Sequence, residues 1–296
     1  MEGKLQSVVY GRLAALESRP IEIKPFFHFH PGSTALTYCC YSCNLRCRWC
    51  QNWRLSRADP LQAQARYVSP EDLVKMALRL GDQGLCCSFT EPTLLHEYNL
   101  AAFALAKAAG LYTCYVSNGY LSVESLRELR AAGLDAIKID VKGDAQVYRE
   151  YCAAPHGEMV WETAAAAKAM GLHVEIVNLV VTGVNDSEEA LRWLIGCHLQ
   201  TLGPETPLHF TRYQPAYQMD APPTPVRTLE RAYSLARELG LAFPYLGNVP
   251  GHPGENTYCP ACGQLLIERA GYTLRRNLLT AQSTCPACER SIPIIA

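Results

Sequence analysis

The sequence predicts an α/β fold, a partial (β/α)6 TIM barrel with a small C-terminal zinc-ribbon-like module. Strand-like and helix-like segments alternate through most of the 296 residues, and two paired-cysteine arms stand near the C-terminus. Alternation of this kind favours a parallel sheet covered by helices, and curling a sheet of six such units gives an open barrel. We therefore expect an N-terminal extension over residues 1–33, the barrel over 34–246 and the module over 247–296.

Runs of apolar, β-branched or aromatic residues mark the expected strands. They lie at residues 34–39, 85–89, 111–116, 136–141, 173–181 and 208–211. A helical segment begins at Ser69-Pro70-Glu71-Asp72, which supplies an N-cap, a first-turn proline and a capping-box acid. Glycines close further helical segments, as C-terminal caps do: Gly110, Gly133, Gly171 and Gly240. Sites in such folds lie at the C-terminal ends of the strands.

The loop after the first strand carries Cys43, Cys47 and Cys50, spaced C-x3-C-x2-C. Cysteine thiolates ligate the irons of a [4Fe–4S] cluster, and a complete protein ligand set needs four. Three thiolates therefore leave one iron open to a ligand from outside the chain. A zinc knuckle or a chance group of buried thiols is the alternative, but zinc prefers paired arms and no second arm lies nearby.

A second cysteine group follows a glycine- and proline-rich stretch at residues 247–254, which indicates a linker or an active-site loop. The arms Cys259-Pro-Ala-Cys262 and Cys285-Pro-Ala-Cys288 are separated by 22 residues. Four thiolates satisfy tetrahedral zinc and leave no catalytic position. A second iron–sulfur cluster is the main rival. We expect the loop and the module behind it to narrow the opening at the C-terminal ends of the strands.

Composition argues against two kinds of partner and favours one compartment. The net charge is −1, from 27 basic and 28 acidic residues, so no strong electrostatic footprint for nucleic acid or anionic membrane is expected. No apolar run reaches the length of a membrane span, and the N-terminus lacks the apolar core of a signal peptide. Fourteen cysteines with metal-like spacings among them indicate a reducing cytoplasm.

Polar residues stand near the end of the fourth expected strand. Lys138, Asp140 and Lys142 alternate with aliphatic residues, and this alternation places the polar set on one face. Because parallel strands normally bury both faces, this set is expected to line a polar cavity, with a solvated strand terminus as the alternative. The side chain of Asn178 on the fifth strand could face the barrel interior, or it could instead hydrogen-bond to a backbone group.

The cysteine motif, with Trp49 before its last cysteine, resembles the signature of the radical S-adenosylmethionine (SAM) superfamily. Much of the chain resembles the radical SAM protein of the AmmeMemoRadiSam system, a family that is itself similar to pyruvate formate-lyase-activating enzymes. The resemblance implies that the amino and carboxylate groups of SAM chelate the open iron. The segments that carry it are PFFHFHPG (25–32), CNLRCRWCQNW (43–53), FTEPT (89–93), SNG (117–119), DVKG (140–143), GVNDS (183–187), 204–215 and 247–262.

The resemblance also implies roles for single residues. The family usually has His where Gln214 stands, so Gln214 or nearby His209 is expected to take its role. The activating enzymes have Gly-Gly where this chain has Phe89-Thr90, which puts the backbone geometry before Glu91 in question. The expected SAM-binding residues are Glu91, Ser117, Asn118, Asp140, Asn178 and Gln214. The expected catalytic residues are Asp140, Lys142 and His209.

Three functions are compatible with these features. The favoured one is a radical SAM enzyme that forms a 5′-deoxyadenosyl radical and abstracts hydrogen from a small molecule or carrier group. Its expected partners are a one-electron reductant such as flavodoxin or ferredoxin and the partner proteins of the AmmeMemoRadiSam system. The second is an activase that places a glycyl radical on a protein, but simple activases lack the C-terminal arms. The third is a non-catalytic electron carrier or metal-ribbon scaffold. A carrier needs no vacant iron, so the open three-cysteine site argues against this function.

Overall fold

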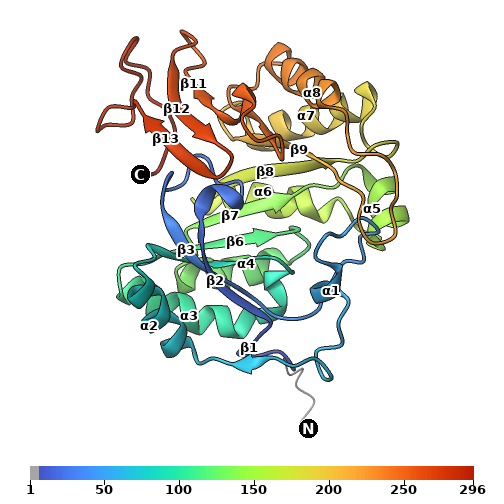
Figure 1. Cartoon of the computed structure of the whole chain (residues 1–296), viewed down its shortest axis with the longest axis vertical. Coiled ribbons are helices and arrows are strands. Elements are labelled where there is room, and N and C mark those ends of the chain that lie inside the picture. Colours follow the sequence, from blue (N-terminus) through green and yellow to red (C-terminus); the bar gives the residue numbers. More distant parts are fainter. Residues whose placement is uncertain (1–6) are drawn as a thin grey trace.

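The computed structural model describes residues 7–296, and its main feature is a curved eight-stranded sheet with helices on the outer face (Figure 1). Seven strands are parallel, and only β2 at one edge is antiparallel. From edge to edge the strands are β10 (Pro244–Gly247), β9 (Leu208–Arg212), β8 (His173–Val180), β7 (Ala136–Asp140), β6 (Tyr112–Ser117), β5 (Gly84–Cys87), β3 (Thr34–Cys39) and β2 (Ala15–Pro20). This arrangement confirms the expected partial barrel.

Six long helices connect the parallel strands: α2 (Pro70–Leu80), α3 (His96–Ala108), α4 (Val123–Ala132), α6 (Met159–Ala169), α7 (Glu188–Leu202) and α8 (Val226–Glu238). The start of α2 follows the sequence prediction, since Ser69 Oγ accepts a hydrogen bond from Asp72 N at 3.1 Å. The helix ends at Gly81, whose φ of 74° places it in the left-handed region that favours glycine. Within residues 7–296 no helix combines the length and the apolar character needed to cross a membrane.

Shorter elements lie in the loops. Two helices belong to loops at the C-terminal ends of strands, α1 (Trp53–Ser56) and α5 (Ala145–Cys152). A two-stranded antiparallel ribbon pairs β1 (Arg12–Leu13) with β4 (Arg66–Tyr67). Three 3-10 turns are η1 (Ile21–Ile23), η2 (Pro92–Leu95) and η3 (Pro253–Glu255).

Two strands of the sheet were not expected. The expected extension contributes β2, which pairs with β3 along its whole length, from Ala15 opposite Cys39 to Pro20 opposite Thr34. As an edge strand β2 is half exposed, so it lacks the apolar run that marks a buried strand. The four residues of β10 add a further parallel strand beside β9. A run this short carries little sequence signal of its own.

The interior of the barrel is closed at the N-terminal ends of the strands. Phe26 and Phe29, from the segment after η1, are buried there in one cluster with Cys86 and Cys114 of the central strands. Burial of a phenylalanine side chain contributes about 2 kcal/mol of stability. An apolar plug therefore fills this end of the barrel and leaves the C-terminal rim for polar side chains.

The C-terminal module packs on the plugged end. Its antiparallel sheet is formed by β11 (Thr257–Tyr258), β12 (Leu265–Ala270) and β13 (Thr273–Asn277). Leu266 and Ile292 share a buried cluster with Phe27 and Phe243, and Phe29 forms a β-bridge with Ile295. Figure 1 shows the red module on the side opposite the blue α1. The expectation that the three-stranded module narrows the C-terminal opening is therefore wrong, because the apolar surface that it covers lies at the other end. The loop after β10 does begin at the C-terminal rim, where Asn248 Nδ2 donates to Arg212 O at 3.0 Å.

Candidate functional site

The cysteine loop lies at the C-terminal rim, between β3 and α1. Its backbone is tied to the end of α5, where Arg46 N donates to Cys152 O at 2.8 Å and Arg48 N donates to Tyr151 O at 2.9 Å. Trp49 is buried, whereas the three cysteines of the motif are half-buried. Backbone contacts thus fix the loop in place while its thiols stay within reach of the rim.

Two of these sulfurs have polar neighbours at hydrogen-bond distance. Cys43 Sγ accepts from Leu45 N at 3.5 Å and from Asn118 Nδ2 at 3.8 Å. Cys50 Sγ lies 3.3 Å from the hydroxyl of Ser56. Such donors stabilise negative charge on sulfur, as cluster ligands require.

The third sulfur has a thiol neighbour. A hydrogen bond from Cys152 lowers the pKa of Cys47 to about 7, with a smaller contribution from the Lys142 ammonium and an opposing one from burial. By contrast, burial raises the pKa of Cys43 to about 12. Cys43 and Cys50 therefore have hydrogen-bond partners in the protein, and three cysteine thiols in one loop are ligands of the type that an iron–sulfur cluster takes.

A buried carboxylate joins the ends of β5 and β6 to the loop. Glu91 accepts hydrogen bonds from Asn118 N and from Ser117 Oγ, both at 2.8 Å. The side-chain amide of Asn118 also donates to Asn44 Oδ1 at 2.8 Å, next to Cys43. Burial raises the pKa of Glu91, although these hydrogen bonds lower it. The structure thus brings three residues predicted to bind SAM together beside the cysteine loop.

Phe89 precedes this carboxylate and has an unusual backbone. Its φ of 65° lies in the left-handed region, where a bulky residue is a rare outlier. Asn52 Nδ2 donates to Phe89 O at 2.8 Å and so connects this strand end to the cysteine loop. The conformation costs about 1–2 kcal/mol for a residue with a side chain. Phe89 therefore adopts a backbone conformation that favours glycine, although it carries a bulky side chain.

Three charged residues lie at the end of β7. Asp140 Oδ1 is 2.5 Å from Lys138 Nζ, and Asp140 Oδ2 is 3.3 Å from Lys142 Nζ. Burial opposes ionisation of Asp140, but the two ammonium groups outweigh it and lower the pKa of Asp140. Two cations therefore share one carboxylate beside Cys47. The sequence predicted these three residues on one face of the strand, and the side chain of Lys138 is only 5% exposed.

Two predicted residues lie elsewhere. His209 is the second residue of β9, and its Nε2 lies 2.7 Å from Glu175 Oε2 in the plugged half of the barrel. Asn178 shares a face of β8 with residues of the helix-facing core, and its Nδ2 donates to Val141 O at 2.9 Å. These placements argue against the catalytic and SAM-binding roles expected for them. Gln214 is exposed in the loop after β9.

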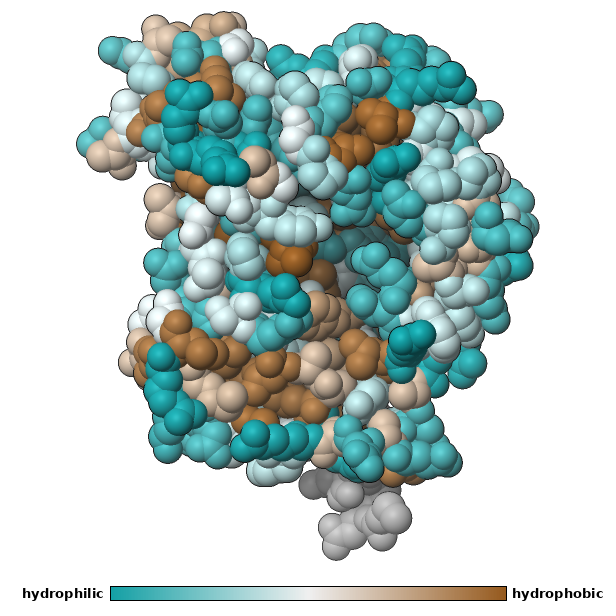
Figure 2. Space-filling view, viewed as in Figure 1, coloured by the Kyte–Doolittle hydropathy of each residue, from teal (hydrophilic) through white to brown (hydrophobic). Residues whose placement is uncertain are grey.

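That loop also makes contacts that the sequence did not indicate. Gln218 N donates to Arg48 O at 2.9 Å, and the Tyr217 ring stacks on Trp53 with centroids 5.3 Å apart. In Figure 1 this loop runs from β9 toward α5 and α1. The space-filling view shows a hollow near the centre of the same face, over β6 to β8 (Figure 2).

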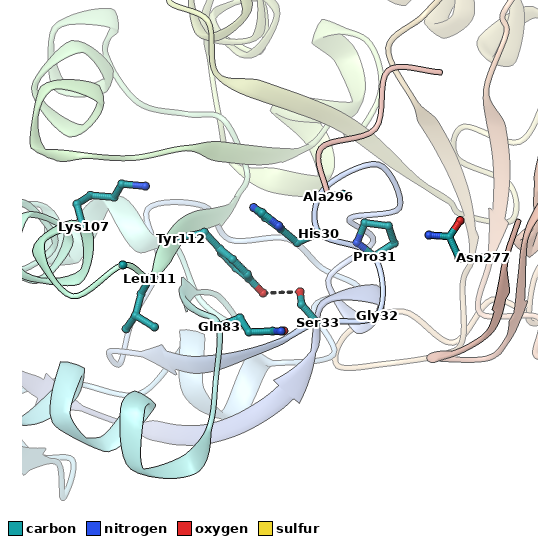
Figure 3. Close-up of a pocket in the computed structure, with 11 residues that line it drawn as sticks. His30, Pro31, Gly32, Ser33, Gln83, Lys107, Leu111, Tyr112, Asn277 and Ala296 are labelled. Atoms are coloured by element: carbon teal, nitrogen blue, oxygen red, sulfur yellow. Dashed lines mark hydrogen bonds between the residues drawn. The ribbon is translucent and has the colours of Figure 1, made fainter. Parts of the chain in front are cut away.

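A separate cavity of about 550 Å³ lies at the N-terminal ends of the strands (Figure 3). There the ring of His30 stacks on Tyr112 with centroids 4.6 Å apart, and the Tyr112 hydroxyl lies 2.8 Å from Ser33 Oγ. Burial lowers the pKa of His30. None of the predicted site residues lines this cavity, so it is distinct from the rim beside the cysteine loop.

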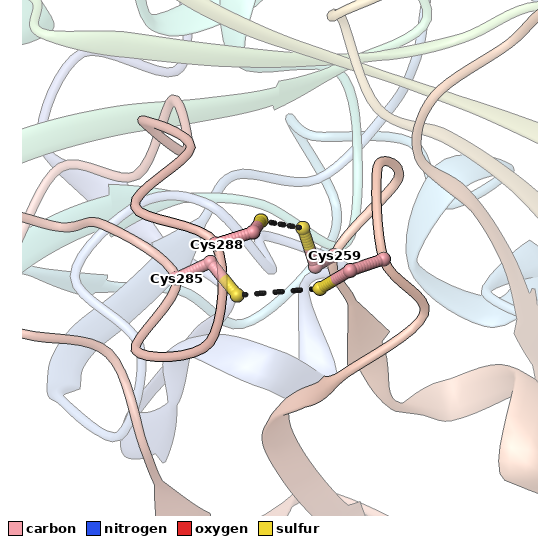
Figure 4. A group of neighbouring side chains, drawn as sticks. Cys259, Cys285 and Cys288 are labelled. Atoms are coloured by element: carbon pink, nitrogen blue, oxygen red, sulfur yellow. Dashed lines mark hydrogen bonds between the residues drawn. The ribbon is translucent and has the colours of Figure 1, made fainter.

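Four thiols converge in the C-terminal module (Figure 4). The sulfurs of Cys259 and Cys288 are 3.5 Å apart, those of Cys262 and Cys285 are 3.7 Å apart, and all four lie within 4.8 Å of one another. Two thiolates bound to one tetrahedral zinc ion at about 2.3 Å would be about 3.8 Å apart. The group therefore fits a single tetrahedral ion.

Comparisons with known proteins agree with this geometry. A family model described as "Radical SAM superfamily" matches residues 38–194, just over half of the chain, and this region includes the cysteine loop and the strand ends through β8. The uncharacterized protein MJ0808 of Methanocaldococcus jannaschii is 41% identical over the whole chain, which covers 88% of that protein.

Solved structures share the fold at low sequence identity. SuiB of Streptococcus suis is similar with a TM-score of 0.55 and 13% identity, over 72% of this chain and 50% of that one. A radical SAM methyltransferase from Sphaerobacter thermophilus is similar with a TM-score of 0.52 and 17% identity, over 80% of this chain and 71% of that one.

Proposed function

The chain belongs to the radical SAM superfamily, and from this premise we propose that it cleaves SAM reductively at a [4Fe–4S] cluster held by Cys43, Cys47 and Cys50. The observation that carries the proposal is the rim itself, where this loop meets both the Glu91 network and the charged end of β7. When bound, the cluster and SAM would supply an electron and a 5′-deoxyadenosyl radical that abstracts hydrogen from an unreactive C–H bond.

The protein's own residues have positioning and charge roles in this proposal. Glu91 fixes the orientation of Ser117 and Asn118, which we propose as contacts for SAM. Lys142 supplies a cation for a carboxylate, and Asp140 holds that ammonium in place. Gln214 remains a proposed contact at the exposed rim.

We propose a small molecule or a carrier group as the substrate. The hollow near the centre of the face shown in Figure 2 supports this choice. Proteins of the AmmeMemoRadiSam system are the candidate partners, on the strength of the sequence segments that resemble that family. The proposal also includes a cytoplasmic location, where thiols stay reduced.

The C-terminal thiols are proposed to hold a structural zinc ion. The sulfur distances of 3.5 and 3.7 Å support one tetrahedral ion over a larger cluster. Such a site has no open coordination position, so its role is to stabilise the proposed module over residues 247–296.

Anaerobic reconstitution tests the central proposal. The loop should take up about four irons, and replacement of Cys43, Cys47 or Cys50 by Ala should abolish formation of 5′-deoxyadenosine from SAM with dithionite. Cys197→Ala, at a half-buried thiol on α7, is the matched control and should retain it. Continued 5′-deoxyadenosine formation in all three loop variants would refute the proposal. A stable glycyl radical on an added protein partner, seen by electron paramagnetic resonance, would instead favour an activase.

A further inference from the structure

The cysteine loop concentrates positive charge. Residues 42–57 contain four arginines and no acidic residue, although the whole chain has a net charge of −1. Arg57 donates to Leu45 O and so turns back into the loop. The side chains of Arg46, Arg48 and Arg54 are exposed. None of the ion pairs found among residues 7–296 involves any of these three.

Two of these arginines lie beside aromatic rings. The Arg48 guanidinium lies 5.6 Å from the centre of the Tyr151 ring, and the Arg54 guanidinium lies 5.5 Å from that of Trp53. Trp53 in turn stacks on Tyr217, and the next residue of that loop donates to Arg48 O. Stacking on aromatic faces holds the guanidinium groups in place without neutralising their charge.

The fold does not require this charge. The backbone N–H groups of Arg46 and Arg48 hold the loop on α5, and substitution of their side chains leaves these bonds intact. Three unpaired like charges within one loop repel each other. Trp53 and Tyr217 are 37% and 40% exposed, so both residues remain accessible to a partner. Exposed Arg and aromatic residues together are typical of binding surfaces.

Resting on the proposed function, we propose that Arg46, Arg48 and Arg54, with Trp53 and Tyr217, form an arginine face that docks an acidic one-electron donor protein of the flavodoxin or ferredoxin class. The donor loses one electron and the cluster gains one, and no bond is made or broken. The same loop holds the proposed cluster ligands and the arginines, so a protein docked on this face is separated from the cluster by a single loop. Complementary charge brings such a partner to this place and speeds its association.

Nucleic acid is the other polyanion to consider. A duplex or single strand is bound by contacts to many phosphates along its length, and this requires an extended basic surface. Here the four arginines of residues 42–57 lie within one short loop of a chain whose net charge is −1. A compact acidic protein that must approach the cluster matches this limited face better.

Charge reversal separates docking from catalysis. The test variant is Arg48→Glu/Arg54→Glu, and the matched control is Arg79→Glu/Arg275→Glu, which changes the net charge equally at exposed positions on α2 and β13. We measure flavodoxin binding to the reconstituted protein by calorimetry and cluster reduction by stopped-flow absorbance. Formation of 5′-deoxyadenosine is measured with flavodoxin or with dithionite.

In the test variant, flavodoxin affinity and the flavodoxin-driven rates should fall roughly tenfold or more. The dithionite-driven rate should stay as in the wild type, and the control should match the wild type throughout. Raising ionic strength from about 20 mM to about 300 mM should weaken flavodoxin binding to the wild type but hardly affect the variant.

Unchanged flavodoxin affinity in the test variant would overturn the proposal. An equal loss of the dithionite-driven rate would also overturn it, because the defect would then lie in the loop itself. Failure of the proposed function looks different: the wild type would form no 5′-deoxyadenosine even with dithionite, while calorimetry would still report on docking.

Discussion

His209 Nε2 lies 2.7 Å from Glu175 Oε2, at the end of the barrel remote from the cysteine loop. The same carboxylate accepts hydrogen bonds from Phe27 N at 2.9 Å and His28 N at 2.8 Å. Burial alone would raise the pKa of Glu175, but hydrogen bonds from His173 and His209 outweigh it and lower that pKa. An ionised carboxylate thus ties the segment 25–32 to the strands and closes this end of the barrel.

Glu175→Gln should therefore destabilise the protein without impairing its chemistry. The substitution removes a buried charge that accepts several hydrogen bonds, so we expect a loss of about 3 kcal/mol in the free energy of unfolding. Denaturant unfolding under anaerobic conditions measures this loss. SAM cleavage per folded molecule should stay near the wild-type value, and a selective loss of cleavage with unchanged stability would show that the pair belongs to the active site.

Two buried histidines should make stability depend on pH. Burial lowers the pKa of His28 to about 3 and that of His198 to about 4, below the ordinary value of 6.5. As pH falls, the unfolded chain protonates these histidines before the folded protein does. The stabilisation from keeping them neutral is therefore fully present above about pH 6.5, the pKa in the unfolded chain, and is lost as pH falls from there toward the folded-state pKa values. Lowering the pH from about 7.5 to about 5 should reduce the free energy of unfolding by about 2 kcal/mol for each histidine.

His198→Gln isolates one of these contributions. The wild type and the variant are unfolded with denaturant at about pH 7.5 and about pH 5, and the difference in their pH dependence is compared. Subtraction cancels the effect of protonating metal-ligating cysteines, which both proteins share. Acidification should destabilise the variant by about 2 kcal/mol less than it destabilises the wild type. Identical pH dependence in the two proteins would mean that His198 titrates normally in the folded state.

Features set by local sequence were predictable, whereas those set by pairing across the chain were not. The cysteine loop and the cap at Ser69 depend on neighbouring residues, and the structure has them as expected. The strand β2 forms because β3 offers an open edge, which no local pattern shows. The distance of His209 from the cysteine loop could not be predicted, because its position along the barrel axis depends on strand register. The stacking of Trp53 on Tyr217 joins segments far apart in sequence.

Removal of the C-terminal thiols should affect the module and spare the cysteine loop. Cys259→Ser/Cys285→Ser should eliminate about one zinc ion per chain, as measured by elemental analysis of protein purified without reconstitution. Because both cysteines belong to the buried cluster that includes Phe27, thermal stability should fall as well. Cys197→Ser is the thiol control. Iron in place of zinc, with visible absorption that this double variant lacks, would identify a second cluster instead.

Asp140→Asn should weaken SAM binding more than it weakens the fold. The change leaves the ammonium groups of Lys138 and Lys142 without their shared carboxylate, so Lys142 loses its fixed position. We expect SAM affinity to fall roughly tenfold, equivalent to about 1.4 kcal/mol, as measured by equilibrium binding to the reconstituted protein.

Lys138→Met is the companion variant for Asp140→Asn. It removes a buried charge but keeps the Asp140–Lys142 pair, so SAM affinity should be less affected. Comparable losses of SAM affinity in both variants would show that the whole charged group, and not the position of Lys142, determines binding.

Cys152→Ala should lower the reduction potential of the cluster. The Cys152 thiol lowers the pKa of Cys47, and a hydrogen bond from this thiol to the ligating sulfur would stabilise the additional negative charge of the reduced cluster. If this bond contributes about 1 kcal/mol, its loss corresponds to about 40 mV for a one-electron couple. Redox titration followed by electron paramagnetic resonance measures the shift. Cys114→Ala, a buried thiol in the plugged half of the barrel, should leave the potential unchanged. An unshifted potential in Cys152→Ala, with iron content intact, would show that the thiol turns away from Cys47 once the cluster is bound.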